Sequence, residues 1–481
     1  MVKRIFPPTL VLCFLLLFSL SVQAGAIAPP TGSGVGQGND YQEVFYLTGK
    51  PILLSGTMDI RPGRGRGDVV DDRYTFRLEN QQEEIRLSRT LTLTTSWRRE
   101  GRQEVREMEV TRFRETVQVG GDRYQANDAD YRFSYSTLTD IHPAAAYFSG
   151  NWSGRKVYEK NRGEGRLTVN TSGETVGYSS PWGETENRRV LTTIDGDQEG
   201  EEGERIPWIG TVQEQASFTR RQEMTYVANE PTAISFSGGY LLTRTGEDIL
   251  LYDYDLPRWN EAGGVRGRNR GSDALYAVLP PQQERLQVPA FRDIRGHRAQ
   301  GEVERMASLG ILEPTGLYFA PGLPMIRGEF ARALALVSAL EPEARQERVF
   351  ADLSPEHPYA PYINALATQQ VVEGGLYNCF EPAAAITRAQ AAVMAVKLLG
   401  FEGLAPVPPY KLPYLDEGQI PLWARDAIYV AGEIGLLTPD SYGRIRPQAI
   451  LSRGDAAVFL DDLVTYLRQD LVEEYRERLL N

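Results

Sequence analysis

The stretch FADLSPEHPYAPYINALATQQVVEGGLYNCFEPAAAITRAQ, residues 350–390, determines the fold expected for the second half of the chain. It combines an aromatic-x-Asp start, an amphipathic helical segment, a hydrophobic turn, a Phe-x-Pro-like element and a closing Thr-Arg-Ala-Gln. The same order of elements occurs in three copies, which start at Phe291, Phe350 and Tyr414. Such self-similarity is the sequence signature of a repeat architecture, so we expect three helical units that share one core.

Each copy ends in a second helix that opens with an arginine. In the middle copy Thr387 and Gln390 fit a capping box, which explains these two residues without any ligand. The arginine needs another reason, because a cation in the first turn faces the positive end of the helix dipole. A guanidinium beside exposed helix N–H groups can hold an anion and grip a carboxylate with two hydrogen bonds. We therefore predict that Arg327, Arg388 and Arg453 bind an acidic ligand. The alternative is that each arginine pairs with an Asp of a neighbouring repeat.

The three segments resemble S-layer homology repeats over about residues 291–467. The resemblance implies an all-α module of three repeats about a pseudo-threefold axis, which binds a cell-wall polysaccharide in grooves between the repeats. It also implies that the bound sugars are ketal-pyruvylated or otherwise anionic. The implied partner is a secondary wall polysaccharide or a glycan linked to peptidoglycan. The copies depart from the family pattern at Ile326, Arg298, Ser452, Gly454 and Asp455.

Other repeated residues are candidates for the same site. Asp293, Asp352 and Asp416 each precede a first helix, where they either hold the local loop or recognise sugar hydroxyls. Tyr359 and Trp423 stand just before the first helices of the second and third copies, where an aromatic ring stacks on a sugar or packs into the core.

Before the repeats, the dominant pattern has a period of two. Its clearest run extends from Ile85 to Trp97, where apolar residues alternate with Arg, Ser and Thr. This pattern predicts an antiparallel all-β region, folded as a sandwich or an open barrel. A membrane-spanning barrel is an alternative that the arginines of other runs, such as Arg112 and Arg114, disfavour.

The N-terminus has the features of a secretory signal peptide. Lys3 and Arg4 precede an apolar run from Leu10 to Leu20, and small residues precede Gly25; an uncleaved anchor is the alternative. The last residues contain neither a sortase signal nor a hydrophobic tail, so we expect non-covalent attachment. The predicted units are a signal peptide at 1–24, a flexible leader at 25–40, the all-β domain at 41–285, repeats at 286–345, 346–406 and 407–470, and a tail at 471–481.

Composition excludes several functions. A net charge of −12 and a pI near 5.1 argue against a nucleic-acid binder, which needs a basic face. We expect no catalytic residue, metal or cofactor, because the sequence shows neither a metal-spaced His/Cys/Asp cluster nor a phosphate-binding glycine loop, and His142 belongs to no recognisable triad. We predict a secreted protein of the cell wall or S-layer surface that displays a structural or binding β domain, with other surface proteins as possible partners. A wall-tethered, glycan-active enzyme with a carboxylate pair is the alternative.

Overall fold

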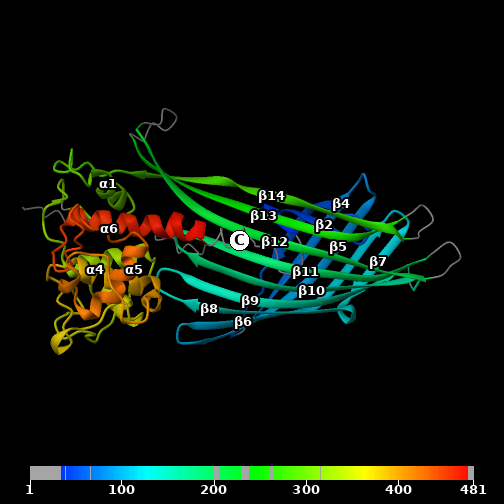
Figure 1. The fold of residues 1–481 in the computed structure, drawn as a ribbon, viewed down its shortest axis with the longest axis horizontal. Helices are drawn as coiled ribbons and strands as arrows, with labels where there is room; N and C mark the ends of the chain where they lie inside the picture. The colour runs from blue at the N-terminus through cyan, green and yellow to red at the C-terminus, as the bar shows by residue number, and fades with distance from the viewer. Residues whose placement is uncertain are drawn as a thin grey trace, which may run out of the picture.

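The computed structural model consists of a long curved β-sheet with a helical module packed at one end (Figure 1). It describes residues 34–37, 39–65, 67–161, 163–199, 205–228, 238–259, 265–314 and 316–474. The predicted signal peptide, the first part of the predicted leader and most of the predicted tail lie outside these ranges. An antiparallel β region followed by a helical region confirms the predicted order of the two parts.

One antiparallel sheet of 14 strands contains all the described strands. Its strand order follows the chain order, except that β8 pairs with β6 and β9. β1 lies against β13 and β14, so the two ends of the strand order come together. The strands are β1 Gly34–Gln37, β2 Asp40–Phe45, β3 Ile52–Arg61, β4 Val69–Asn80, β5 Ile85–Glu100, β6 Gln103–Val119, β7 Asp122–Asn127, β8 Tyr131–Ile141, β9 Ala146–Lys160, β10 Gly165–Ser180, β11 Gly183–Glu199, β12 Arg205–Val227, β13 Gly239–Trp259 and β14 Val265–Gln287.

Alternation along the strands separates a packed interior from a polar exterior. In β5, Leu87 and Leu91 are buried while Ser88 is exposed, as the period of two predicts. The interior also contains Arg89, which pairs with Glu43 at 2.7 Å. Arg89 also pairs with Glu115, so this buried charge of β5 has counter-charges on β2 and β6.

The predicted leader is wrong from Gly34 onward, because β1 begins there and pairs with β2. A Cβ atom at Gly34 would overlap the ring of Tyr41, so this glycine permits close packing. At the other end of the region β14 continues to Gln287, just beyond the predicted boundary at residue 285.

The helical module has three outer and three inner helices among the described residues. The inner helices α2, α4 and α6 contribute more buried apolar residues to its core than the outer helices do. No helix in the described ranges is both long and apolar enough to cross a membrane. The outer helices are α1 Gln300–Ser308, α3 Ala360–Thr368 and α5 Arg425–Glu433, and the inner helices are α2 Arg327–Val337, α4 Arg388–Leu399 and α6 Arg453–Thr465.

The C-terminal ends of α2 and α4 contact turns of the β-sheet, and α6 runs toward the sheet (Figure 1). Trp182, in the turn between β10 and β11, donates its indole N–H to Val337 O of α2 at 2.6 Å. Ala144, in the turn between β8 and β9, donates its backbone N–H to Leu398 O of α4 at 3.0 Å. Carbonyls in the last turn of a helix lack helical donors, so the β turns cap these helices.

His142, the histidine of the β region, packs against the end of α4. A Cβ atom at Gly400 would overlap the His142 ring, and Gly400 has a φ of 77° that favours glycine. His142 Nε2 forms a hydrogen bond with Asp140 at 2.9 Å. His142 is therefore packed into the junction between the sheet and the helices.

We predict that replacing Trp182 lowers the stability of the helical module. Trp182→Ala removes a side chain that is 8% exposed and leaves the Val337 carbonyl without its donor. Loss of a large buried aromatic side chain costs about 3–5 kcal/mol. Thermal unfolding followed by helical circular dichroism should show a lower midpoint than in the Trp97→Ala control, which removes a half-buried indole from β5. Equal shifts for the two variants would contradict a stabilising junction.

Candidate ligand-binding sites at the helix starts

The segments that lead into α2, α4 and α6 are joined in a closed ring of three backbone hydrogen bonds. The N–H of Met325 donates to Leu451 O at 2.9 Å, and the N–H of Leu451 donates to Ile386 O at 3.0 Å. The N–H of Ile386 completes the ring by donating to Met325 O at 2.9 Å. Each of the three arginines follows one residue of this ring by two positions in the chain.

Backbone N–H groups at these helix starts are already bonded. At the start of α2, Arg327 N donates to Ala384 O at 2.8 Å and Gly328 N donates to Pro382 O at 2.8 Å. The expectation of exposed N–H groups is therefore wrong for the first two residues of each helix, and an anion would depend on the arginine side chains. The corresponding bonds are Arg388 to Ala449, Ala389 to Pro447, Arg453 to Leu323 and Gly454 to Pro321.

Each arginine lies on the Phe-x-Pro-like loop of the next helix pair. We call these places helix-start sites 1, 2 and 3, centred on Arg327, Arg388 and Arg453. At sites 1 and 3 the guanidinium carbon lies 4.7 Å from the centre of an aromatic ring, Phe380 and Phe319 respectively. Site 2 has an isoleucine in that position.

Site 3 is closed by ion pairs within the protein. Arg453 donates to the carboxylate of Glu329, to Phe319 O at 2.9 Å and to Glu313 O at 2.9 Å. Arg298 pairs with Asp455 beside it. The alternative of pairing between repeats therefore describes Arg453, although its partner is a glutamate.

Sites 1 and 2 differ, because neither arginine forms an ion pair with a carboxylate in the described residues. Arg388 donates Nε to Ile445 O at 2.8 Å and a terminal nitrogen to Thr438 O at 3.3 Å. Arg327 Nε is buried and has no hydrogen-bond partner. Burial lowers the pKa of both arginines, against the attraction of nearby carboxylates. An unpaired buried donor costs about 1–3 kcal/mol, so site 1 favours an added acceptor at Arg327.

The three candidate aspartates share one structural role. Asp352 accepts the backbone N–H groups of Phe380 and Glu381, each at 2.7 Å. Glu381 has a positive φ of 59°, so the carboxylate holds a strained loop in place. Both oxygens are occupied, which favours loop holding over sugar recognition. The equivalent contacts join Asp293 to Phe319 and Ala320, and Asp416 to Ile445 and Arg446.

The two candidate aromatic residues lie in segments that contact α2 and α4. Tyr359 is half-buried and packs against the start of α2, where a Cβ atom at Gly328 would come within 2.8 Å of its ring. Trp423 lies in a short turn, Leu422–Ala424, that contacts α4, and it is 60% exposed. Tyr359 therefore lies next to the start of α2 at site 1, and Trp423 lies in a turn that contacts the helix of site 2.

The sequence analysis missed Glu329, the residue that closes site 3. Glutamate three residues after a cap position is typical of a capping box, which hides any other role. Residue Ile326 at that cap position has no side-chain oxygen, and it makes no cap hydrogen bond. The missing cap was the signal that Glu329 has another partner. In contrast, the capping box of Thr387 and Gln390 is confirmed.

We predict that the stability contributed by the contact between Asp293 and its loop is lost at acidic pH. Burial alone would raise the pKa of Asp293, but the N–H groups of Phe319 and Ala320 hold that pKa below its ordinary value. The contribution is then complete above an ordinary Asp pKa of about 3.9 and is lost as pH falls further. Asp293→Asn should lower stability at neutral pH by about 1–3 kcal/mol, because an amide donor faces a backbone N–H.

Thermal unfolding at pH 7, 5 and 3 measures both effects. Asp293→Asn should lose less stability between pH 5 and pH 3 than the unmodified protein does. The exposed Asp59→Asn is the control. A pH profile identical to that of the unmodified protein would contradict the contact.

Comparison with known proteins identifies the helical module. Residues 290–331 and 349–392 match the S-layer homology domain. An endoglucanase from Bacillus sp. (strain KSM-635) is 32% identical over 130 residues, which are 27% of this chain and 13% of the relative. An amylopullulanase from Thermoanaerobacterium thermosulfurigenes is 23% identical over 221 residues, 45% of this chain and 12% of the relative. An exoglucanase from Acetivibrio thermocellus is 25% identical over 263 residues, 52% of this chain and 24% of the relative.

The chain thus spans less than a quarter of the length of each of these relatives. The matched segments contain Asp293 and Asp352, which hold equivalent loops, and Arg327 and Arg388, which begin equivalent helices. This chain therefore carries S-layer homology repeats at residues 290–331 and 349–392.

Proposed function

We propose that the protein is held non-covalently on the cell wall by its helical module and displays the β-sheet unit at the surface. S-layer homology repeats support wall anchoring. We propose further that residues 407–470 form a third repeat, and that the three are arranged about a pseudo-threefold axis. The closed ring of backbone hydrogen bonds supports this arrangement, as does the loop contact of Asp416, which repeats those of Asp293 and Asp352.

The ligand we propose is an anionic secondary wall polysaccharide, with ketal-pyruvylated sugars as the candidate. The observation that carries this proposal is that Arg327 and Arg388 have no carboxylate partner in the described residues, whereas Arg453 has one. A carboxylate on a sugar would supply the acceptor, and Tyr359 or Trp423 would stack on the ring. Sites 1 and 2 are therefore the binding sites, and site 3 stabilises the module.

The proposed location is the cell wall or S-layer surface of a secreted protein. The signal-peptide pattern of residues 1–24 supports secretion. Surface location would put the β unit in contact with the medium and with other surface proteins.

The glycan-active enzyme alternative gains little support. The relatives carry enzyme names, but the chain spans only a small part of each. Burial alone would raise the pKa of Glu115, but Arg89 and Lys156 lower it to about 2. Glu115 is then ionised at neutral pH and cannot serve as a general acid.

We predict that binding to wall polymer depends on Arg327 and Arg388. Arg388→Ala and Arg327→Ala should each weaken binding of the full chain to purified sacculi by about tenfold to a hundredfold, because each removes a charged hydrogen-bond donor. Arg388→Lys should restore only part of the affinity, since ammonium lacks the two-pronged geometry. Cosedimentation with sacculi measures the affinity.

Two controls separate this role from folding and from total charge. Exposed Arg444→Ala removes the same charge from a nearby loop and should bind normally. Arg453→Ala should lower thermal stability, because it leaves Glu329 buried without its partner. Full binding by the Arg327→Ala, Arg388→Ala double variant with an intact helical signal would refute the proposed sites.

Attachment itself gives a further prediction. A chaotrope should release a protein that is held by hydrogen bonds and ion pairs from intact cells, without cleavage of the wall. Immunoblots of guanidinium extracts should contain the full-length mature chain. Retention through boiling detergent would indicate a covalent bond.

A further inference from the structure

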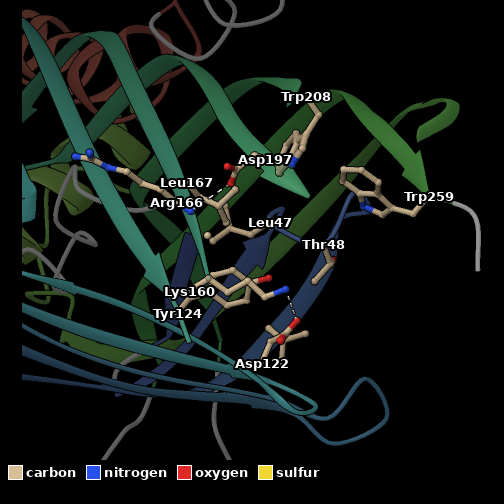
Figure 2. A pocket seen from close by; sticks show the side chains of 12 residues that line it. Leu47, Thr48, Asp122, Tyr124, Lys160, Arg166, Leu167, Asp197, Trp208 and Trp259 are labelled. Atoms are coloured by element: carbon tan, nitrogen blue, oxygen red, sulfur yellow. Dashed lines mark hydrogen bonds and ion pairs between the residues drawn. The ribbon is translucent and has the colours of Figure 1, made fainter. Parts of the chain in front are cut away.

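A pocket lies at the end of the β-sheet unit that is remote from the helical module. Its lining comes from the strand ends opposite those that meet the inner helices, including the end of β9, the start of β10 and the start of β12. Figure 2 shows the indoles of Trp208 and Trp259 on one wall and the side chains of Tyr124 and Lys160 on another. Ligand pockets commonly occur at the mouths of β-barrels.

The two tryptophans are held in place before any ligand arrives. Their rings meet edge to face, with centres 5.5 Å apart at an angle of 83°. A Cβ atom at Gly196 would come within 2.8 Å of the Trp208 ring, and one at Gly49 would come within 2.5 Å of Trp259 Nε1. These glycines therefore allow the backbone to pack directly against the indoles, and a preorganised site loses little entropy on binding.

The formal charges of the side chains that line the pocket cancel: Asp122 and Asp197 are negative, and Lys160 and Arg166 are positive. The Arg166 side chain points away from the other lining residues (Figure 2). Lys160 pairs with Asp122 at 2.8 Å, and Asp197 pairs with Arg205 at 3.0 Å. A charged ligand would have to break one of these pairs. A neutral ligand can accept and donate hydrogen bonds at their exposed edges, as it can at the hydroxyl of Thr48.

The volume of the cavity further restricts the class of ligand. The cavity volume is about 160 Å³, below the roughly 300–1,000 Å³ typical of sites for drug-sized ligands. The occupant must therefore be small, with an apolar face for the indoles and hydroxyls for the polar wall. A pyranose ring has both features.

We propose that this pocket binds one neutral pyranose residue, either as a free sugar or as the end of a glycan chain. Trp259 supplies the stacking face, and Lys160 and Thr48 bind the hydroxyls. This site is separate from helix-start sites 1 and 2 in place and in charge, and it does not depend on wall binding.

Titration calorimetry and tryptophan fluorescence on the full chain test the proposal. The probes are the methyl glycosides of glucose, galactose and N-acetylglucosamine, together with trisaccharides that end in each of these sugars. At least one of these sugars should show saturable binding. Equal affinity for a glycoside and its trisaccharide would indicate recognition of the single ring, and tighter trisaccharide binding would indicate a glycan end.

Variants locate the binding. Trp259→Ala should weaken binding at least about tenfold, and Trp259→Phe, which keeps a smaller stacking face, should weaken it less. Thr48→Val tests the polar wall without removing core volume. Trp97→Ala should leave affinity unchanged, because Trp97 does not line the pocket. The proposal would be overturned if none of the sugars showed saturable binding, or if Trp259→Ala left the affinity unchanged. It would also be overturned if indole showed saturable binding and no sugar did.

Discussion

The ring of backbone hydrogen bonds through Met325, Leu451 and Ile386 is the constraint on which the helical module depends. It fixes where α2, α4 and α6 begin. Because each helix start then reaches the Phe-x-Pro-like loop of the next pair, the ring also places each arginine on a neighbouring segment. Each proposed site takes its residues from two neighbouring segments. The proposed binding residues would therefore come together only when both segments are folded.

The backbone is equivalent at the three helix starts, and the side chains make them different. Asp293, Asp352 and Asp416 hold the same loop in the same way. Ile326 provides no capping oxygen, and Glu329 turns instead to Arg453. The isoleucine at the cap position 326 thus accompanies the closure of site 3, whose arginine belongs to another segment. Repeated geometry alone does not make a repeat a binding site.

Local patterns explain what could be predicted from the sequence. The alternation in β5 and the capping box of Thr387 depend on near neighbours, and both are confirmed. The strand at Gly34 was missed because its glycine serves a contact with Tyr41 across the pair, which composition does not reveal. The partner of Arg453 lies 124 residues away in the chain, and this separation makes the pair invisible to local reasoning.

The junction connects the two proposed binding regions. Trp182 and the turn before β9 cap the C-terminal ends of α2 and α4, and Arg221 of β12 pairs with Glu473 just beyond α6 at 3.3 Å. The arginine sites occupy the opposite, N-terminal ends of these helices. The pocket with Trp259 lies at the other end of the sheet. A chain bound to wall polymer through its helix starts would therefore hold the pocket at the end of the molecule farthest from the attachment point. A junction built from buried contacts and helix caps, in place of a flexible linker, maintains that orientation.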